Sequence, residues 1–148
     1  MAIYNLQVLR GLSTARSLLS CREDGLVDLW LEDDGSGRQR WELIALPGDG
    51  PNVFNIKVAS AQAKRFLSCT ADGLKVDLFD RDDGSGRQKW VLVKAPAATP
   101  QIPAYYTLNP LRGAEGLLSC TPDGTKVDLF TGGNTGRQRW QLQGQPLP

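Results

Sequence analysis

The stretch that decides the fold is Asp33-Asp34-Gly35-Ser36-Gly37-Arg38-Gln39-Arg40-Trp41, because nearly the same sequence occurs twice more in the chain. The second copy covers residues 82–90, and the third, in altered form, covers residues 132–140. Their final tryptophans, Trp41, Trp90 and Trp140, lie 49 and 50 residues apart. Self-similarity at a period of roughly 20 to 50 residues is typical of repeat architectures. The sequence therefore predicts three matching structural units.

The repeated unit is larger than this turn. Each copy also contains Leu-Ser-Cys, Asp-Gly and Val-Asp-Leu followed by an aromatic residue, which places the units at about residues 1–49, 50–99 and 100–148. A unit of about 50 residues cannot easily bury a core of its own. We therefore expect one domain over residues 1–148 rather than three independent ones.

Short alternating segments predict that the chain is all-β. Residues 4–8 and 54–58 alternate apolar and polar side chains, as half-buried strands do, and no helical periodicity extends far. Residues 106–108 begin in the same way, but Pro110 is expected to end that strand early or to place it at an edge. The Asp-Gly pairs predict two-residue hairpin turns between the second and third strands of each unit. Four strands per unit give about twelve, with Pro-rich connections at 47–51, 96–103 and 146–148.

The strand that follows each Asp-Gly pair has two chemically different faces. In residues 27–30, Val and Leu share one face, while Asp28 and Trp30 share the other. If the aliphatic pair faces the core, the acid and the aromatic point outward, and an alternative is that the aromatics only cover the sheet edge. The last strand of each unit puts its tryptophan on the inner face together with Leu43, Leu92 or Leu142.

Bulk composition argues against several classes of function. The chain of 148 residues contains no histidine, which removes the commonest metal ligand and the usual base of nucleophilic triads. The net charge is +1 with both signs interspersed, so no nucleic-acid footprint is apparent. The neighbouring acids Asp33-Asp34 and Asp82-Asp83 fit turn formation better than a glycosidase pair or a cation site, because they lie on a flexible turn and the third unit lacks them. We expect a non-enzymatic protein without a metal or cofactor.

The three cysteines occupy the same place in each unit. An odd number of equivalent positions, Cys21, Cys69 and Cys120, favours buried free thiols over disulfides. Free thiols suit a reducing compartment, and the amino terminus shows neither a signal-peptide pattern nor a membrane span. We therefore expect a cytoplasmic protein that does not insert into membranes.

Three four-stranded units that each close on Gln-x-Trp, at 39–41, 88–90 and 138–140, resemble the β-trefoil of ricin-B-type lectins. The resemblance covers essentially the whole chain. The motifs of the three units are most similar to those of small cytosolic lectins of mushrooms and related bacterial β-trefoil proteins. It implies a lectin with up to three equivalent shallow sites, which binds glycans or glycoproteins, with galactose or GalNAc as the expected sugar type. The sequence leaves open whether the chain forms a homodimer.

The resemblance also implies which residues would bind the sugar. Ricin-type sites use an early Asp, an aromatic from the third strand and an Asn before the Gln-x-Trp glutamine. With the acid of the third strand added, the matching positions are Asp24, Asp28, Trp30 and Arg38, then Asp72, Asp77, Phe79 and Arg87, then Asp123, Asp128, Phe130 and Arg137. The third site is expected to be the weakest, because its turn is one residue shorter and lacks the acidic pair.

Two departures from the family pattern leave the sugar specificity open. Arg stands where the ricin pattern has Asn, and Asp occupies a strand position more often filled by Gln. The set still suits a sugar, because carboxylates accept from hydroxyls, guanidinium groups donate, and an aromatic face covers a C–H patch. The alternative for Arg38, Arg87 and Arg137 is an Arg–Asp pair that clamps each hairpin.

Two other functions remain open at this point. One is a protein-binding β-trefoil such as a protease inhibitor or a cytoskeletal cross-linker, since one fold hosts many functions. The other places function in the divergent segments 47–53 and 95–104, with the triplication serving only the core. Recurrence of the outward acid and aromatic in all three units favours repeated recognition of a small ligand.

Overall fold

The computed structural model describes residues 2–9, 11–97, 99–100, 104–133 and 135–144. Within these residues the chain forms twelve strands and a single three-residue 3₁₀ helix, η1, at Gly136–Gln138. The strands of the first unit are β1 Ala2–Val8, β2 Leu18–Cys21, β3 Val27–Trp30 and β4 Trp41–Ala45. Those of the second are β5 Val53–Val58, β6 Phe66–Cys69, β7 Val76–Phe79 and β8 Trp90–Ala95, and those of the third are β9 Tyr105–Pro110, β10 Leu117–Cys120, β11 Val127–Phe130 and β12 Trp140–Gly144. No helix among the described residues is long and apolar enough to cross a membrane.

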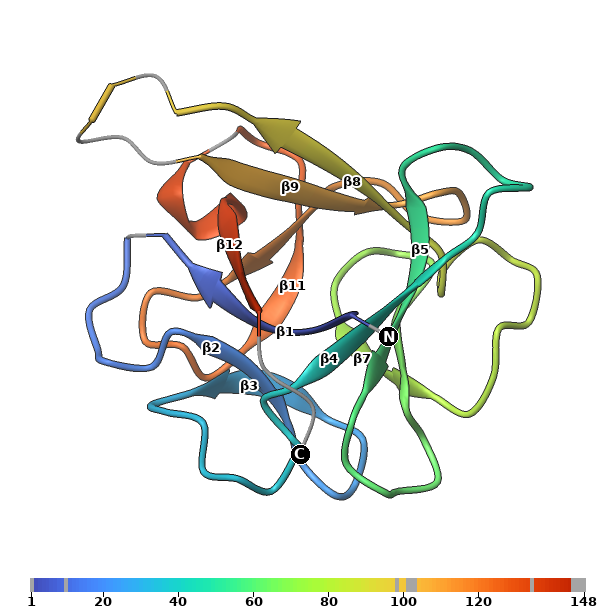
Figure 1. Ribbon diagram of the computed structural model, residues 1–148, viewed down its shortest axis with the longest axis horizontal. Coiled ribbons are helices and arrows are strands. Elements are labelled where there is room, and N and C mark those ends of the chain that lie inside the picture. Colours follow the sequence, from blue (N-terminus) through green and yellow to red (C-terminus); the bar gives the residue numbers. More distant parts are fainter. Residues whose placement is uncertain (1, 10, 98, 101–103, 134, 145–148) are drawn as a thin grey trace.

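The first and last strands of the three units close into a barrel. The antiparallel pairs run β1–β4, β4–β5, β5–β8, β8–β9, β9–β12 and back from β12 to β1. The second and third strands of each unit form the hairpins β2–β3, β6–β7 and β10–β11. Figure 1 shows hairpin β2–β3 lying below β1, with β4 leading from the first unit into the second. The all-β prediction with three four-stranded units is therefore confirmed.

The three hairpins bind one another in a ring through their Asp-Gly turns. The carbonyl of Gly25 accepts from the Leu78 amide at 2.9 Å, that of Gly73 from Leu129 at 3.1 Å, and that of Gly124 from Leu29 at 3.0 Å. The three glycines have φ values of 89°, 73° and 75°, in the left-handed region where a side chain would be strained. Glycine at this position thus lets each turn face the next hairpin.

The hairpins are confirmed, but their turns are longer than two residues. Because Cys21 pairs with Val27 and Cys69 with Val76, the turns cover 22–26 and 70–75, and the third covers 121–126. In the first turn the amide of Gly25 donates to the Arg22 carbonyl, and the Asp24 carboxylate accepts from the Leu26 amide. The aspartate therefore acts as a side-chain turn cap, and only the glycine has positive φ.

The Gln-x-Trp motif ties each unit to the core. Trp41, Trp90 and Trp140 are completely buried, and each indole N–H donates to a backbone carbonyl of the second strand, at Leu19, Leu67 and Leu118. The buried amide of Gln39 donates to Ser20 at 2.9 Å and accepts from the Asp34 amide at 3.0 Å. Gln88 and Gln138 make the matching bonds in their own units. The prediction that the three tryptophans belong to the core is confirmed.

The cysteines are free and buried, as predicted. Burial raises the pKa of Cys21 and Cys69 to about 11 and that of Cys120 to about 12. At neutral pH these thiols are protonated, and they pack as small apolar groups beneath the hairpins.

The expectation for Pro110 is wrong, and the reason is its place in the strand. β9 is as long as β5, and it pairs with both β8 and β12 inside the barrel. Pro110 is its last residue, opposite Trp90, where Val58 stands opposite Trp41. In the other units the residue at this position donates a backbone hydrogen bond to the chain just before the next hairpin. The Val8 amide donates to the Ser17 carbonyl at 2.9 Å, and the Val58 amide donates to the Arg65 carbonyl at 2.8 Å. Proline has no such donor, and β10–β11 forms a separate two-stranded sheet.

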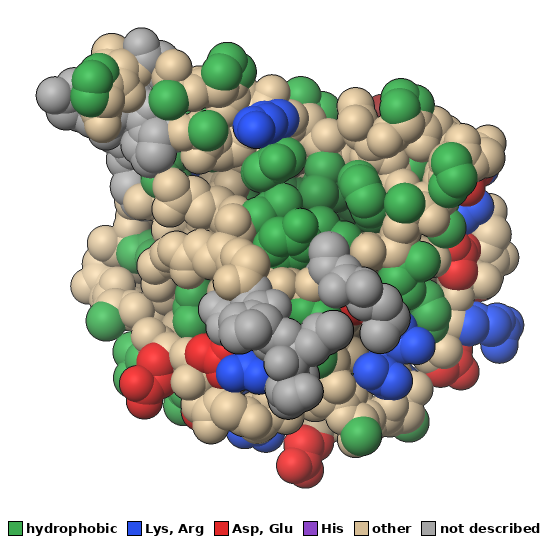
Figure 2. All heavy atoms as spheres, viewed as in Figure 1, with side chains coloured by type: hydrophobic (Ala, Val, Ile, Leu, Met, Phe, Trp, Pro, Cys, Tyr) green, Lys and Arg blue, Asp and Glu red, His purple; other side chains and the backbone are tan. Residues whose placement is uncertain are grey.

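Polar and apolar side chains are distributed unevenly over the surface. Figure 2 shows hydrophobic side chains gathered near the middle of one face, over β5, β8 and β9, with charged side chains along the lower and right-hand margins. The repeated turn of the first unit, residues 31–40, connects β3 to β4. The site described next lies between this turn and hairpin β2–β3.

Candidate functional site

The four residues predicted for the first unit line one open hollow of about 700 Å³. Asp28 and Trp30 come from β3, where Val27 and Leu29 are buried and the two others are only partly so. Arg38 comes from the turn before β4, and Asp24 from the hairpin turn. The remaining lining residues are Ser20, Cys21, Arg22, Glu23 and Gln39. We call this hollow the first-unit site.

Asp28 is a half-buried carboxylate without a hydrogen bond from any described residue. Burial raises its pKa above the ordinary value, while the charges of Arg16, Arg22 and Arg38 oppose that shift. Such a group retains free acceptor lone pairs, and pairing them with a donor recovers part of the cost of desolvation. It is therefore suited to accept hydrogen bonds from a ligand.

Trp30 supplies an aromatic surface beside this carboxylate. Its ring is half-buried, and the guanidinium carbon of Arg16 lies 5.1 Å from the ring centroid. A cation at this distance from an aromatic face is attracted to it, so Arg16 helps to hold the indole in place. The rest of the ring lines the first-unit site, where it can pack against C–H groups.

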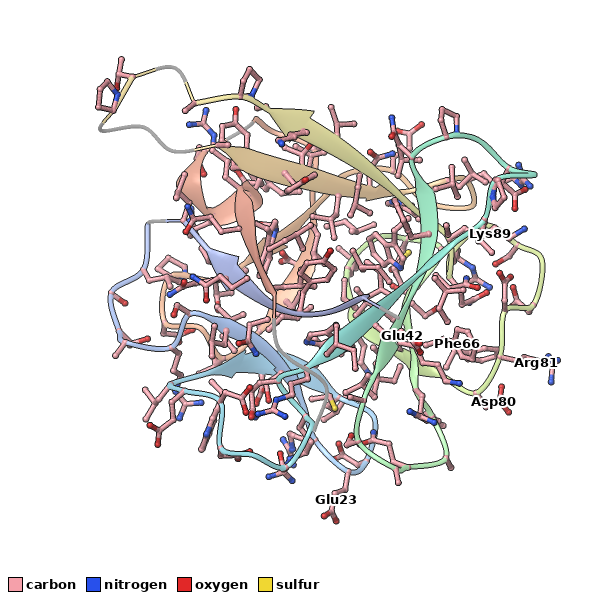
Figure 3. All side chains as sticks on the ribbon, viewed as in Figure 1. Glu23, Glu42, Phe66, Asp80, Arg81 and Lys89 are labelled. Carbon is pink, nitrogen blue, oxygen red and sulfur yellow. The ribbon has the colours of Figure 1, made fainter. Side chains whose placement is uncertain are left out.

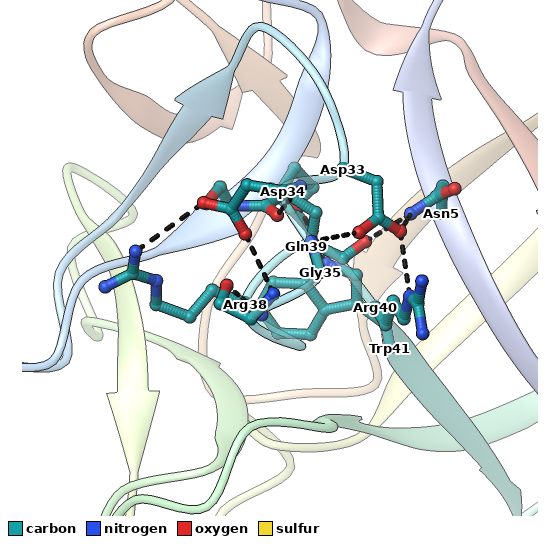
Figure 4. Close-up of polar contacts among 11 residues, drawn as sticks. Asn5, Asp33, Asp34, Gly35, Arg38, Gln39, Arg40 and Trp41 are labelled. Carbon is teal, nitrogen blue, oxygen red and sulfur yellow. Dashed lines mark hydrogen bonds and ion pairs between the residues drawn. The ribbon is translucent and has the colours of Figure 1, made fainter. Parts of the chain in front are cut away.

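Arg38 is held only loosely. Its side chain is 34% exposed, and its guanidinium nitrogens lie 3.6 Å from Asp34 and 3.9 Å from Glu23. Exposed ion pairs of this kind contribute little. On the other side of the same turn, Arg40 makes a 2.8 Å ion pair with Asp33, which also accepts from Asn5. Figure 4 shows Asp33 between Asn5 and Arg40, with Arg38 pointing away from them.

The ion pairs of this turn test the alternative that Arg38 pairs with an aspartate to clamp the hairpin. The tight pair in the first unit joins Arg40 to Asp33, whereas Arg38 pairs at long range with Asp34 of its own turn. Burial acts to raise the pKa of Asp33, but hydrogen bonds from Arg40, Gly35 and Asn5 outweigh it and lower that pKa. In the first unit the tight pair is thus made by Arg40, and Arg38 lines the site with donors that only weak ion pairs engage.

Asp24, Asp72 and Asp123 serve the hairpin turns. Asp72 accepts from the Leu74 amide at 3.0 Å and Asp123 from the Thr125 amide at 3.1 Å, as Asp24 does from Leu26. Hydrogen bonds from Thr121 and Thr125 lower the pKa of Asp123 to about 2. One carboxylate oxygen of each is therefore already engaged. Among the three, Asp24 lines the first-unit site.

The second and third units do not reproduce the first-unit site. Burial raises the pKa of Asp77 and Asp128, as it does for Asp28. However, the five best-formed hollows do not bring together the acid, aromatic and arginine of either unit within the described residues. Phe130, 41% exposed, instead lines a different hollow of about 1260 Å³ that lies against residues 109–117 and Asp72.

In the second and third units, the neighbouring unit packs on the stem of the arginine. The segment that follows the first strand of the next unit lies over each arginine. A Cβ added to Gly113 would lie 2.8 Å from Cγ of Arg87, and one added to Gly11 would lie 2.8 Å from Cγ of Arg137. The backbone therefore packs on the aliphatic stems of these two side chains, while the side chain of Arg87 remains 30% exposed, close to the 34% of Arg38. The counterpart near Arg38 is Ala61, and a hollow remains between them.

Sequence comparison of the units misses several residues near the site. Arg22 and Glu23 line it. These two residues are not repeated in the other units, whose counterparts are Thr70 with Ala71 and Thr121 with Pro122, so comparison of the units does not single them out. Ser60 and Gln62 approach Arg38 from the second unit. The sequence signal that could have identified Gln62 is its polarity, since Leu12 and Ala114 stand at the same distance after the first strand.

No protein-family model and no curated protein sequence matches the chain. Solved structures do match it. One, described as the structure and mode of action of a mosquitocidal holotoxin, has a TM-score of 0.75 and 14% identity over 97% of this chain. This chain spans only 17% of the holotoxin chain.

A second match is the designed 3-fold symmetric protein ThreeFoil, with a TM-score of 0.69 and 24% identity. It covers 95% of this chain and 97% of its own. At these identities the likeness shows the fold alone. Together with the six-stranded barrel and its ring of three hairpins, it shows that the chain has the β-trefoil fold.

Proposed function

We propose that this chain is a non-enzymatic carbohydrate-binding protein whose principal site is the first-unit site. The observation that carries the proposal is the joint lining of one open hollow by Asp28, Trp30 and Arg38. Each of the three has capacity left for a ligand. Asp28 has free acceptors, Trp30 has a partly exposed ring, and Arg38 has only weak ion pairs.

The chemistry of a sugar matches these three groups. Vicinal hydroxyls donate to a carboxylate, hydroxyl and ring oxygens accept from guanidinium N–H groups, and the C–H face of a pyranose packs on an indole. Galactose and GalNAc are the sugars we propose, because their axial hydroxyl at C4 leaves a continuous C–H patch on the opposite face of the ring. Glycans and glycoproteins that display them are then the partners.

The three units are not equal in this proposal. The first-unit site is the strongest because Asp28, Trp30 and Arg38 line one hollow together. The sites around Asp77 and Asp128 are weaker, and glycine backbones pack on the stems of Arg87 and Arg137 there. A shallow site with few contacts binds a monosaccharide weakly, since the polar groups must first give up water.

A glycan array tests the proposal, with labelled wild type compared with Trp30→Ala and with Leu31→Ala as the matched control. Leu31 is 53% exposed, is the next residue along the chain, and does not line the hollow. Wild type and Leu31→Ala should bind galactose- or GalNAc-terminated glycans, and Trp30→Ala should lose them. Wild-type protein that binds no glycan on the array contradicts the proposal.

A further inference from the structure

A second hollow adjoins the first-unit site. It has a volume of about 440 Å³ and lies between the repeated turn of the first unit and the segment that joins β5 to β6. Its lining residues are Glu23, Ser36, Arg38, Ser60, Ala61 and Gln62. Glu23 and Arg38 line both hollows, so these two side chains form a shared wall.

This wall is weak. The only ion pair between its two members joins a guanidinium nitrogen of Arg38 to a carboxylate oxygen of Glu23 at 3.9 Å, and the Glu23 side chain is 88% exposed. Figure 3 shows Glu23 projecting at the margin of the molecule. An exposed pair at this distance resists separation little, because water screens it. When the two side chains part, the hollows become one continuous trough.

The far end of the trough is polar and fixed in position. The side-chain amide of Gln62 donates to the Lys64 carbonyl at 3.1 Å and to the Arg22 carbonyl at 3.4 Å, and its oxygen accepts from the Ser60 hydroxyl at 2.7 Å. The bond to Arg22 ties the segment of the second unit to the hairpin of the first, and the other two hold Gln62 within its own segment. The Ser60 oxygen, which donates here, keeps acceptor capacity for a ligand hydroxyl.

The corresponding segments of the other units lack a polar residue at the position of Gln62. Leu12 and Ala114 stand where the second unit has Gln62, and both pack against the hydrophobic core. Gly11 and Gly113 stand where it has Ala61, and their backbones pack on the stems of Arg137 and Arg87. A polar trough that extends past the arginine is therefore found, within the described chain, at the first unit.

We propose that the first-unit site binds an oligosaccharide rather than a single sugar. One residue lies against Asp28 and Trp30, and the next passes Arg38 into the hollow formed by Ser36, Ser60 and Gln62. This inference rests on the proposed carbohydrate-binding function and specifies its ligand as a glycan of two or more residues. It also makes the site a joint product of two units, which the threefold repeat does not predict.

Calorimetric titration tests the inference with galactose, GalNAc, lactose, N-acetyllactosamine and a Gal-GalNAc disaccharide. The variants are Gln62→Leu, which copies the residue at Leu12, and Ser60→Ala. The control is Ser13→Ala, which removes a similar hydroxyl from the matching segment next to the third unit, where Ser13 donates to the Pro122 carbonyl at 3.1 Å. Thermal unfolding of each variant confirms that it is folded.

For wild type and the control, at least one disaccharide should bind roughly tenfold tighter than its monosaccharide, a difference of about 1.4 kcal/mol. Gln62→Leu and Ser60→Ala should reduce that gain and leave monosaccharide affinity within about twofold. Disaccharides that bind no tighter than monosaccharides, or variants that keep the full gain, overturn the inference while the proposed function stands. Wild-type protein that binds none of the five sugars overturns both.

Discussion

Two neighbouring side chains in the repeated turn have different tasks. Gln39 is 1% exposed and bonds Ser20 and the Asp34 amide, which fixes the turn on the hairpin. Arg38 points the other way, makes only weak ion pairs, and lines two hollows. Within the same repeated motif, Gln39 thus stabilises the fold and its neighbour Arg38 contributes to the candidate site.

The two kinds of tryptophan should separate stability from binding. Trp41→Ala removes a completely buried indole and its hydrogen bond to Leu19, and should lower the free energy of unfolding by about 3–5 kcal/mol. Trp30→Ala removes a half-buried ring, and should cost much less while it abolishes sugar binding. Urea unfolding followed by circular dichroism measures both. Equal losses of stability would show that Trp30 is a core residue.

Asp28 should reduce the stability of the fold at neutral pH. Its folded-state pKa is raised, mainly by burial, so the ionised form is disfavoured in the folded chain. A raised carboxyl pKa costs stability above the folded value, and the cost disappears as the pH falls below the unfolded value of 3.8.

The substitution Asp28→Asn should therefore raise the free energy of unfolding at pH 7 and change it little near about pH 3. The same substitution should weaken sugar binding. A gain in stability together with a loss of affinity is expected where a residue serves binding at the expense of stability. Urea titrations at both pH values check this. A variant that is less stable than wild type at pH 7 would show that the Asp28 carboxylate stabilises the fold.

At the scale of the element, the strands could be predicted closely and the connections could not. The segment 27–30 matches β3 at both ends, because its side-chain alternation and the turn glycine before it are local signals. The effect of Pro110 is not local, since the bond it lacks would join β9 to the next hairpin. The packing of Gly113 on Arg87 and the approach of Gln62 to Arg38 also cross between units.

Restoring the missing donor should strengthen the third unit. Pro110→Val gives that strand the residue found at Val8 and Val58, and its amide can then donate to the chain just before β10. We expect a gain of about 1 kcal/mol in unfolding free energy and slow hydrogen exchange at the new amide. The reverse substitution, Val58→Pro, serves as the control and should be destabilising. Fast hydrogen exchange at residue 110 would show that the new amide does not bond to the chain before β10.

At the scale of the whole molecule, the sequence predicts up to three sites of which the third is the weakest, and therefore a stoichiometry between two and three. We propose one dominant site, because the acid, aromatic and arginine of the first unit line one hollow, and because glycine backbones pack on the stems of Arg87 and Arg137. Calorimetry with galactose or GalNAc should show a tightest phase of one sugar per chain. Trp30→Ala should remove this phase and Phe79→Ala should retain it. Three sites of equal affinity would contradict this asymmetry.

The most direct test of a sugar site at Trp30 uses the four tryptophans of the chain as reporters. The indole N–H groups of Trp41, Trp90 and Trp140 are buried and bonded to carbonyls, whereas Trp30 lines the first-unit site. In a ¹⁵N–¹H correlation spectrum titrated with galactose or GalNAc, the Trp30 indole signal should move in a saturable way and the other three should stay nearly fixed. A Trp30 signal that does not move at saturating sugar would contradict the account.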